Sequence, residues 1–173
     1  MSFNAKGSFD LALRNTVLED SSLKGRKLAD DTRVLCATPG YLARNDTPQL
    51  PDDLSSHQLI AFRDPSPRPL VGRNGEQGVF DPKQAGCRLI MDDGASQKTA
   101  TLAGAGISIN SLWSIHRELA NGSLVRILPD FEVSHETVLW LVYPKTNILT
   151  AKVRVFIDFL LDRIGKSPEW ARA

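Results

Sequence analysis

The chain has 173 residues, of which 42% are hydrophobic and 24% are charged. This length and composition are typical of one globular domain or two small lobes, and they exclude a disordered chain. The net charge of +1 is too low for a protein that grips DNA or an anionic membrane with its own surface. The sequence shows neither a membrane span nor a secretory signal, so we expect a cytoplasmic protein without membrane contact.

The two cysteines, Cys36 and Cys87, lie too far apart in the sequence for a Cys-x-x-C motif. The three histidines also lack the spacing of a metal site. We therefore expect reduced thiols, no metal and no cofactor. We expect His57, in a loop, and His116, on a helix, to be solvated surface residues.

The hydrophobic pattern predicts strands that alternate with helices, which is typical of the α/β class. A polar stretch over 15–27 follows the first strand, and turns and hairpins are predicted over 64–86. The continuous apolar run 138–142 predicts a strand buried on both faces, as in a parallel sheet covered by helices. The strands are predicted at 9–14, 33–38, 59–62, 88–91, 107–109, 125–128 and 138–142, and the helices at 39–42, 94–103, 112–119 and 149–164.

No pattern in the sequence supports catalysis. Gly104 and Gly106 follow a predicted helix instead of opening one, so they are helix stops and not a dinucleotide-binding loop. Ser108 lies inside a predicted strand and lacks the final glycine of a nucleophile elbow. Asp92 and Asp93 are adjacent, and Asp93 is better explained as a helix cap. We therefore expect that the protein is not an enzyme.

The remaining polar positions favour binding of a small anion. Arg14 ends a predicted strand, where open α/β sheets place their ligands. Residues 94–96 open a predicted helix, and Asn110 and Ser111 open another, so free N–H groups are available there. Together these groups suit a small carboxylate. A structural salt bridge of Arg14 and plain helix capping stay open as alternatives.

The order of several segments resembles the effector-binding domain of LysR-type transcriptional regulators. The resemblance runs from about Phe9 to Ile164, and it depends on the order and spacing of many pieces together. The matching segments are 9–14, 28–43, 48–57, 91–94, 102–107, 122–128 and 153–159.

The resemblance implies a periplasmic-binding-protein-like (type II) fold, with two α/β lobes joined by crossing strands and a small effector between them. It implies a remnant of the first lobe at 1–32, the second lobe at 33–137, and the return strand and final helix at 138–173. One side of the cleft would be lined by Arg14, Lys24 and Arg26, and the other by Gly94, Ala95, Ser96, Asn110 and Ser111. The family usually has a proline near Ser111, so the family's cleft contacts are not carried over to this position.

The family also carries an N-terminal helix-turn-helix, a linker helix and opening elements of the first lobe, and none of these precedes Phe9. We therefore expect a fragment with an incomplete first lobe. The implied function is effector sensing, with a small carboxylate as partner, DNA contacted only through the missing N-terminal domain, and a homo-oligomeric protein. The alternatives are a free-standing solute-binding protein of the same fold, or an enzyme.

Overall fold

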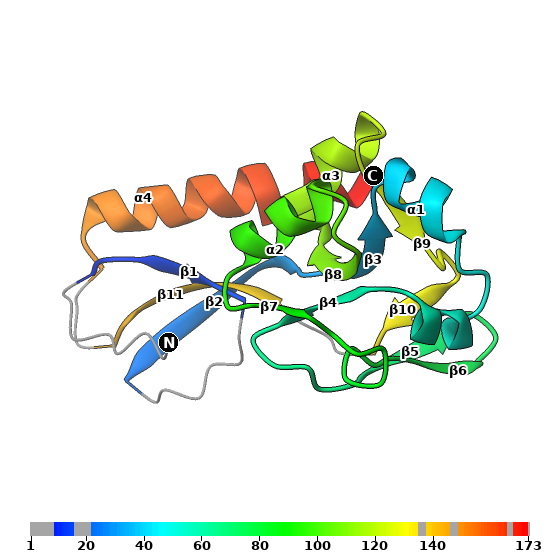
Figure 1. The fold of residues 1–173 in the computed structure, drawn as a ribbon. Coiled ribbons are helices and arrows are strands. Elements are labelled where there is room, and N and C mark those ends of the chain that lie inside the picture. The colour runs from blue at the N-terminus through cyan, green and yellow to red at the C-terminus, as the bar shows by residue number, and fades with distance from the viewer. Residues whose placement is uncertain (1–8, 16–21, 135–137, 146–148, 166–167, 173) are drawn as a thin grey trace. The chain divides into compact units, whose positions relative to one another are not determined.

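The computed structural model describes residues 9–15, 22–134, 138–145, 149–165 and 168–172. The chain divides into two compact units, Met1–Thr32 with Glu136–Arg172 (unit 1) and Arg33–His135 (unit 2). Both units combine sheets with helices (Figure 1), which confirms the predicted α/β class. No helix among the described residues has the length and apolar character needed to cross a membrane.

Unit 1 is built on a three-stranded sheet in the order β1-β11-β2. Its strands are β1 (Ala12–Arg14), β2 (Leu23–Asp30) and β11 (Val138–Pro144). The central strand β11 pairs antiparallel with both neighbours, so the predicted parallel sheet is wrong at this strand. The apolar run reflects burial, since Leu141 and Val142 are at most 2% exposed, and burial does not specify the direction of a partner strand.

Strand β2 begins inside the stretch for which the sequence predicted no element. Residues 24–27 are all exposed, although they lie in the strand. These four residues, three cations and a glycine, include no hydrophobic side chain, so the alternation of polar and hydrophobic residues that marks a strand is missing. Only Leu28 and Ala29, which join the hydrophobic core of unit 1, are buried in the second half of the strand.

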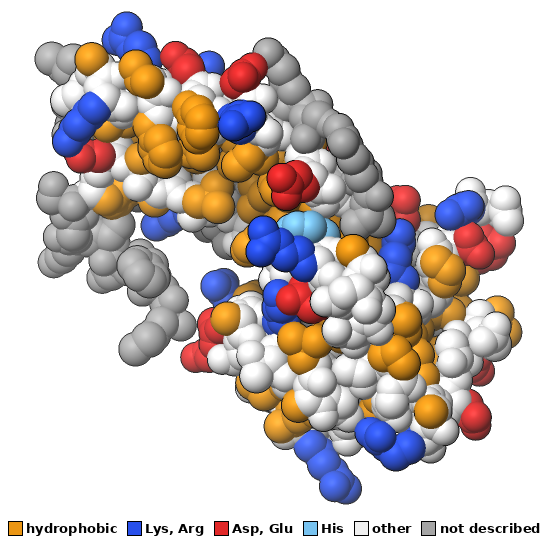
Figure 2. Space-filling model, turned by 90° about the horizontal axis from the view of Figure 1, so that it is seen from above, with side chains coloured by type: hydrophobic (Ala, Val, Ile, Leu, Met, Phe, Trp, Pro, Cys, Tyr) orange, Lys and Arg blue, Asp and Glu red, His pale blue; other side chains and the backbone are white. Residues whose placement is uncertain are grey.

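The last helix is amphipathic as predicted, but its buried face is narrower. Helix α4 (Ala151–Leu160) is followed by one π-helical turn (Leu161–Gly165) and, after a gap, by a 3-10 turn (Glu169–Arg172). Val153 and Ile157 pack into the core, whereas Phe156, which was expected in the apolar stripe, is 51% exposed. Val155 and Phe159 are also exposed, and hydrophobic side chains gather along this helix in Figure 2.

Unit 2 contains a five-stranded mixed sheet in the order β7-β4-β8-β3-β9. Strand β4 pairs parallel with β7 and β8, whereas β3 pairs antiparallel with β8 and β9. The predicted strands are therefore confirmed. Their bounds are β3 (Arg33–Ala37), β4 (Leu59–Phe62), β7 (Leu89–Met91), β8 (Ile107–Ser111) and β9 (Val125–Ile127).

A second, smaller sheet of unit 2 has the order β10-β5-β6. It contains β5 (Arg68–Gly72) and β6 (Gln77–Phe80), which form the antiparallel hairpin predicted within 64–86, and β10 (Phe131–Val133), which the sequence did not reveal. The helices of unit 2 are α1 (Pro39–Asn45), a 3-10 helix (Pro51–Ser56), α2 (Gly94–Leu102) and α3 (Leu112–Ala120).

Candidate functional site

The parallel strands of unit 2 bring three chain segments to one edge of the sheet. Phe62 is level with Met91 across β4 and β7, and Ile60 is level with Ser108 across β4 and β8. Asn110 lies two residues beyond Ser108, so it stands at the same level as Phe62 and Met91. In open α/β sheets, ligands bind at the carboxyl ends of parallel strands. This edge is therefore the candidate site of unit 2.

Arg63 follows β4 directly and places a cation at this edge. Its backbone has a φ of 64°, which is uncommon for a residue other than glycine. The Arg63 N–H donates to Met91 O at 2.6 Å, and its guanidinium lies 5.2 Å from the centre of the Phe62 ring. Backbone strain of this kind tends to gather at functional sites. Arg63 was not among the site residues predicted from the sequence, although its place after a predicted strand was a usable signal.

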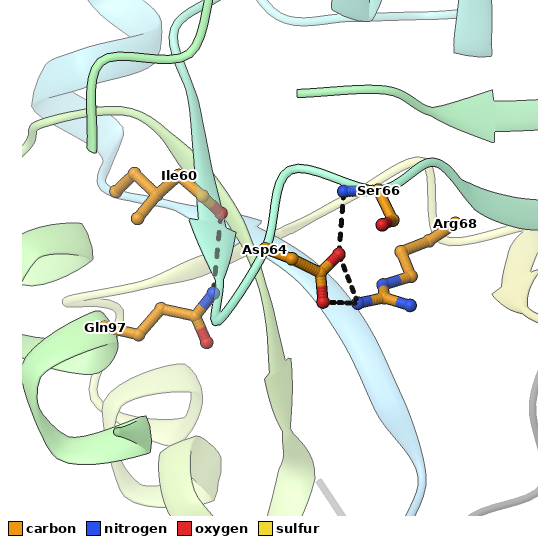
Figure 3. A network of polar contacts seen from close by, with 5 residues as sticks. All are labelled: Ile60, Asp64, Ser66, Arg68 and Gln97. Carbon is orange, nitrogen blue, oxygen red and sulfur yellow. Dashed lines mark hydrogen bonds and ion pairs between the residues drawn. The ribbon is translucent and has the colours of Figure 1, made fainter. Parts of the chain in front are cut away.

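Arg68, by contrast, already has a carboxylate partner. Its Nη2 lies 3.4 Å from both carboxylate oxygens of Asp64 (Figure 3). Hydrogen bonds from Ser66 are the main cause that lowers the pKa of Asp64, and Arg68 adds to the effect. No ion pair of Arg63 is found among the residues that the structure describes, so its charge is available to a ligand.

The start of α2 was expected to hold an anion at Gly94, Ala95 and Ser96. The carboxylate of Asp93 already lies there, because its Oδ1 accepts the Ser96 N–H at 2.9 Å. Hydrogen bonds from Ser96 lower the pKa of Asp93. The capping role of Asp93 is confirmed, and the Ser96 N–H is used inside the protein.

The first turn of α2 is hydrogen-bonded to β4. Gln97 is only 4% exposed, and its Nε2 donates to Ile60 O at 3.4 Å (Figure 3). Helix α2 also packs against β8. The beginning of α2 and the ends of β4, β7 and β8 therefore form one connected framework within unit 2.

Two further candidates lie at the end of β8. Asn110 is buried, and its Nδ2 donates to Ser108 Oγ at 2.6 Å. Ser111 occupies the N-cap position of α3, but its side chain makes no capping hydrogen bond. Unit 2 thus places five candidates at one end of its sheet, namely Gly94, Ala95, Ser96, Asn110 and Ser111.

The remaining candidates belong to unit 1. Arg14 ends β1 and lies level with Trp140 of β11. Lys24 is exposed on β2, whereas the Nη1 of Arg26 lies 3.4 Å from Asp158 Oδ1 of α4. Both side chains of this ion pair are about half exposed to solvent, so the pair is weak and a ligand can compete for Arg26.

The two described histidines do not contribute to the site, and His135 lies outside the described residues. His57 is 6% exposed, so the expectation of a solvated surface residue is wrong. Its Nδ1 lies 3.3 Å from the Tyr41 hydroxyl, which places it in the interior beside α1. His116 is half-buried. Among the described residues, no group of three or more His, Cys, Asp or Glu side chains is arranged to hold a metal ion.

A family model described as "LysR substrate binding domain" matches residues 4–165. The chain belongs to this family. The transcriptional regulator CrgA of Neisseria meningitidis serogroup C is 29% identical over 158 residues, which cover 91% of this chain and 52% of CrgA. PtxR of Pseudomonas aeruginosa is 32% identical over 159 residues, covering 92% of this chain and 50% of PtxR. The chain spans about half the length of these curated relatives.

Similar solved structures support the assignment of the chain to this family. The regulatory domain of Neisseria meningitidis CrgA matches with a TM-score of 0.75 and 28% identity, over 88% of this chain and 74% of that one. Full-length Vibrio cholerae AphB matches with a TM-score of 0.74 and 27% identity, over 89% of this chain and 51% of AphB. These LysR-type regulatory domains have the periplasmic-binding-protein-like type II fold, so the predicted fold class is confirmed.

Proposed function

We propose that this chain is the effector-sensing part of a LysR-type transcriptional regulator and that it binds a small anionic molecule, a carboxylate, without making or breaking a covalent bond. The observation that carries this proposal is the family match over residues 4–165. The relatives named above are transcriptional regulators, which supports a role in binding and regulation over catalysis.

The contribution of unit 2 to this binding would come from the carboxyl ends of β4, β7 and β8. Arg63 supplies a guanidinium that has no described carboxylate partner, and a guanidinium can bind a carboxylate through two parallel hydrogen bonds. The N–H groups of Gly94 and Ala95 would be further donors, although Asp93 competes for that of Ala95. Arg14, Lys24 and Arg26 are the candidate cations that unit 1 would offer.

Regulation would follow from a shift between conformations. An effector that binds one arrangement of the regulator more tightly than another changes their populations by that difference in affinity. DNA would be contacted by a helix-turn-helix domain of a longer protein, in line with relatives of about twice this length. The shift would change how the copies pair in a homo-oligomer, and this change in pairing would alter the contacts with DNA.

The direct test is a thermal-shift screen of the purified chain with small aromatic and aliphatic carboxylates. A ligand at about 100 times its Kd stabilises the folded state by about 2.7 kcal/mol. That corresponds to a rise of about 5–10 °C in Tm for a chain of this size. Absence of a shift with every compound would contradict the proposal.

Variants of Arg63 test the assignment of the site. Arg63→Gln is expected to weaken binding of the selected carboxylate by about 10-fold to 100-fold, because a hydrogen bond to a charged group is lost. Arg117→Gln, at an exposed position on α3, removes the same charge and should leave the affinity unchanged. Equal losses of affinity in both variants would show that binding depends on the net charge of the protein and not on a contact with Arg63.

A further inference from the structure

A chain of buried polar contacts links the end of β8 to the first turn of α2. Asn110 Nδ2 lies 2.6 Å from Ser108 Oγ, and Ser108 Oγ lies 2.6 Å from Thr101 Oγ1. Thr101 Oγ1 lies 2.8 Å from Gln97 O. All four residues are at most 5% exposed, so these short contacts have to be hydrogen bonds, each with its own proton.

Counting these protons fixes the orientation of the Asn110 amide. Gln97 O is a carbonyl and can only accept, so the Thr101 hydroxyl must donate its single proton to it. The Thr101–Ser108 contact then needs the Ser108 proton. No hydroxyl proton remains for the third contact, so it must come from the NH2 group of Asn110. A flipped amide would set two acceptors against each other at 2.6 Å.

The second N–H of Asn110 also points into the protein. Its Nδ2 lies 3.5 Å from Sγ of Cys36, a thiol that is fully buried. Burial raises the pKa of Cys36 to about 11, so the sulfur is a neutral thiol and a weak acceptor. Both donors of the Asn110 amide are therefore used inside unit 2.

The carbonyl oxygen of Asn110 is left as the atom that a ligand can use. No hydrogen bond to its Oδ1 is found among the residues that the structure describes, although the side chain is only 5% exposed. Oδ1 is also not among the described side-chain atoms that are enclosed and lack a partner, so solvent or a ligand can reach it. Asn110 stands level with Phe62 and Met91, at the edge that also carries Arg63.

We propose that Asn110 is a specificity-determining residue that accepts a hydrogen bond from the effector through Oδ1. This inference rests on the proposed function and narrows its ligand class. The effector would carry a hydroxyl or ammonium donor in addition to its carboxylate. Asn110 was predicted to help hold the anion, but its amide has no N–H left for a carboxylate. It would instead accept a hydrogen bond from the neighbouring hydroxyl or ammonium group of the effector.

Matched pairs of carboxylates test this inference on the wild-type chain. The pairs are malate and succinate, lactate and propionate, and salicylate and benzoate, each measured by thermal shift and calorimetric titration. One added hydrogen bond predicts about 3-fold to 10-fold tighter binding of the hydroxylated member. Equal binding within the pairs, or tighter binding of the member without the hydroxyl, would overturn the inference while leaving the proposed function intact.

The variant Asn110→Leu provides the control, because leucine has a similar shape and no polar atoms. The preference for the hydroxylated member should disappear in this variant, whereas its persistence would overturn the inference. If the variant does not fold, the wild-type comparison still decides. If no compound with or without a hydroxyl binds, the inference and the proposed function both fail.

Discussion

At the scale of single residues, Gly106 has no room for a side chain. A Cβ atom at this position would lie 2.2 Å from Gln58 O, and the same oxygen accepts the Ile107 N–H at 2.8 Å. Gly106→Ala is therefore expected to lower the free energy of unfolding by about 1–3 kcal/mol, as overpacking does. Urea unfolding followed by circular dichroism measures this difference.

The matched control is Gly40→Ala in α1. The nearest atom to its added Cβ would be Arg44 Nη1 at 3.7 Å, which is an ordinary contact. This variant should unfold at the same urea concentration or slightly higher, because alanine favours helices. A loss at Gly40 as large as at Gly106 would show that the backbone contact with Gln58 is not the cause.

The buried His57 predicts a dependence of stability on pH. Burial lowers its pKa in the folded state, against the opposing effects of Asp53 and Asp46. In the unfolded chain, His57 takes up a proton with the usual histidine pKa of about 6.5, whereas in the folded protein it takes up the proton only at lower pH. The free energy of unfolding therefore falls as the pH drops below about 6.5. Urea unfolding at pH 5.5 and 7.5 should show a smaller loss for His57→Gln than for the wild type.

The residues of the candidate site were only partly predictable. Asn110 and residues 94–96 could be selected because strand ends and helix starts leave a signal in the hydrophobic pattern. The capping of α2 by Asp93 was also predictable. The orientation of the Asn110 amide was not, because it depends on contacts with Thr101 and Ser108 that only the folded backbone creates. The place of Arg63 after a predicted strand was a usable signal, but its unusual φ could not be predicted from the sequence.

At the scale of elements, helices α2 and α3 are joined by an ion pair. Lys98 Nζ lies 2.7 Å from Glu118 Oε1 and also donates to Ser114 O at 2.8 Å. Lys98 is the main cause that lowers the pKa of Glu118. The stabilisation is therefore complete above the unfolded pKa of about 4.3 and is lost as the pH falls through the folded value.

The variant Glu118→Gln is accordingly expected to have a lower Tm than the wild type at pH 7. The difference should shrink as the pH falls below about 4, where the wild-type carboxyl is also neutral. Glu132→Gln, at an exposed position in β10, should leave Tm unchanged at both pH values. A difference between wild type and Glu118→Gln that does not depend on pH would contradict the role of the charge.

Element prediction succeeded where the hydrophobic period was clear. Strands β3, β4, β7 and β8 and the buried side of α4 follow directly from their patterns. Strand β2 was missed because residues 24–27 include no hydrophobic side chain, and β10 was missed because three residues carry too little periodicity. The direction of β11 could not be read from its sequence, since antiparallel partners can bury both of its faces as fully as parallel ones.

At the scale of the whole molecule, the near-neutral charge has a direct consequence for DNA binding. With a net charge of +1, the chain lacks the excess of cations that a phosphate backbone attracts. We therefore expect the purified 173-residue chain to give no shift of operator DNA in a gel, even at low salt. A tight, salt-sensitive shift would place DNA binding within these residues. It would contradict the proposal that this chain binds the effector and a separate domain binds DNA.

The central claim is that a small carboxylate binds at the carboxyl ends of β4, β7 and β8. The most direct measurement is a titration of the isotope-labelled chain, followed by amide chemical shifts, with the carboxylate that gives the largest thermal shift. We predict that within unit 2 the largest changes occur at residues 62–64, 91–96 and 110–111. Changes confined to other parts of unit 2, or none at a saturating concentration, would contradict the account.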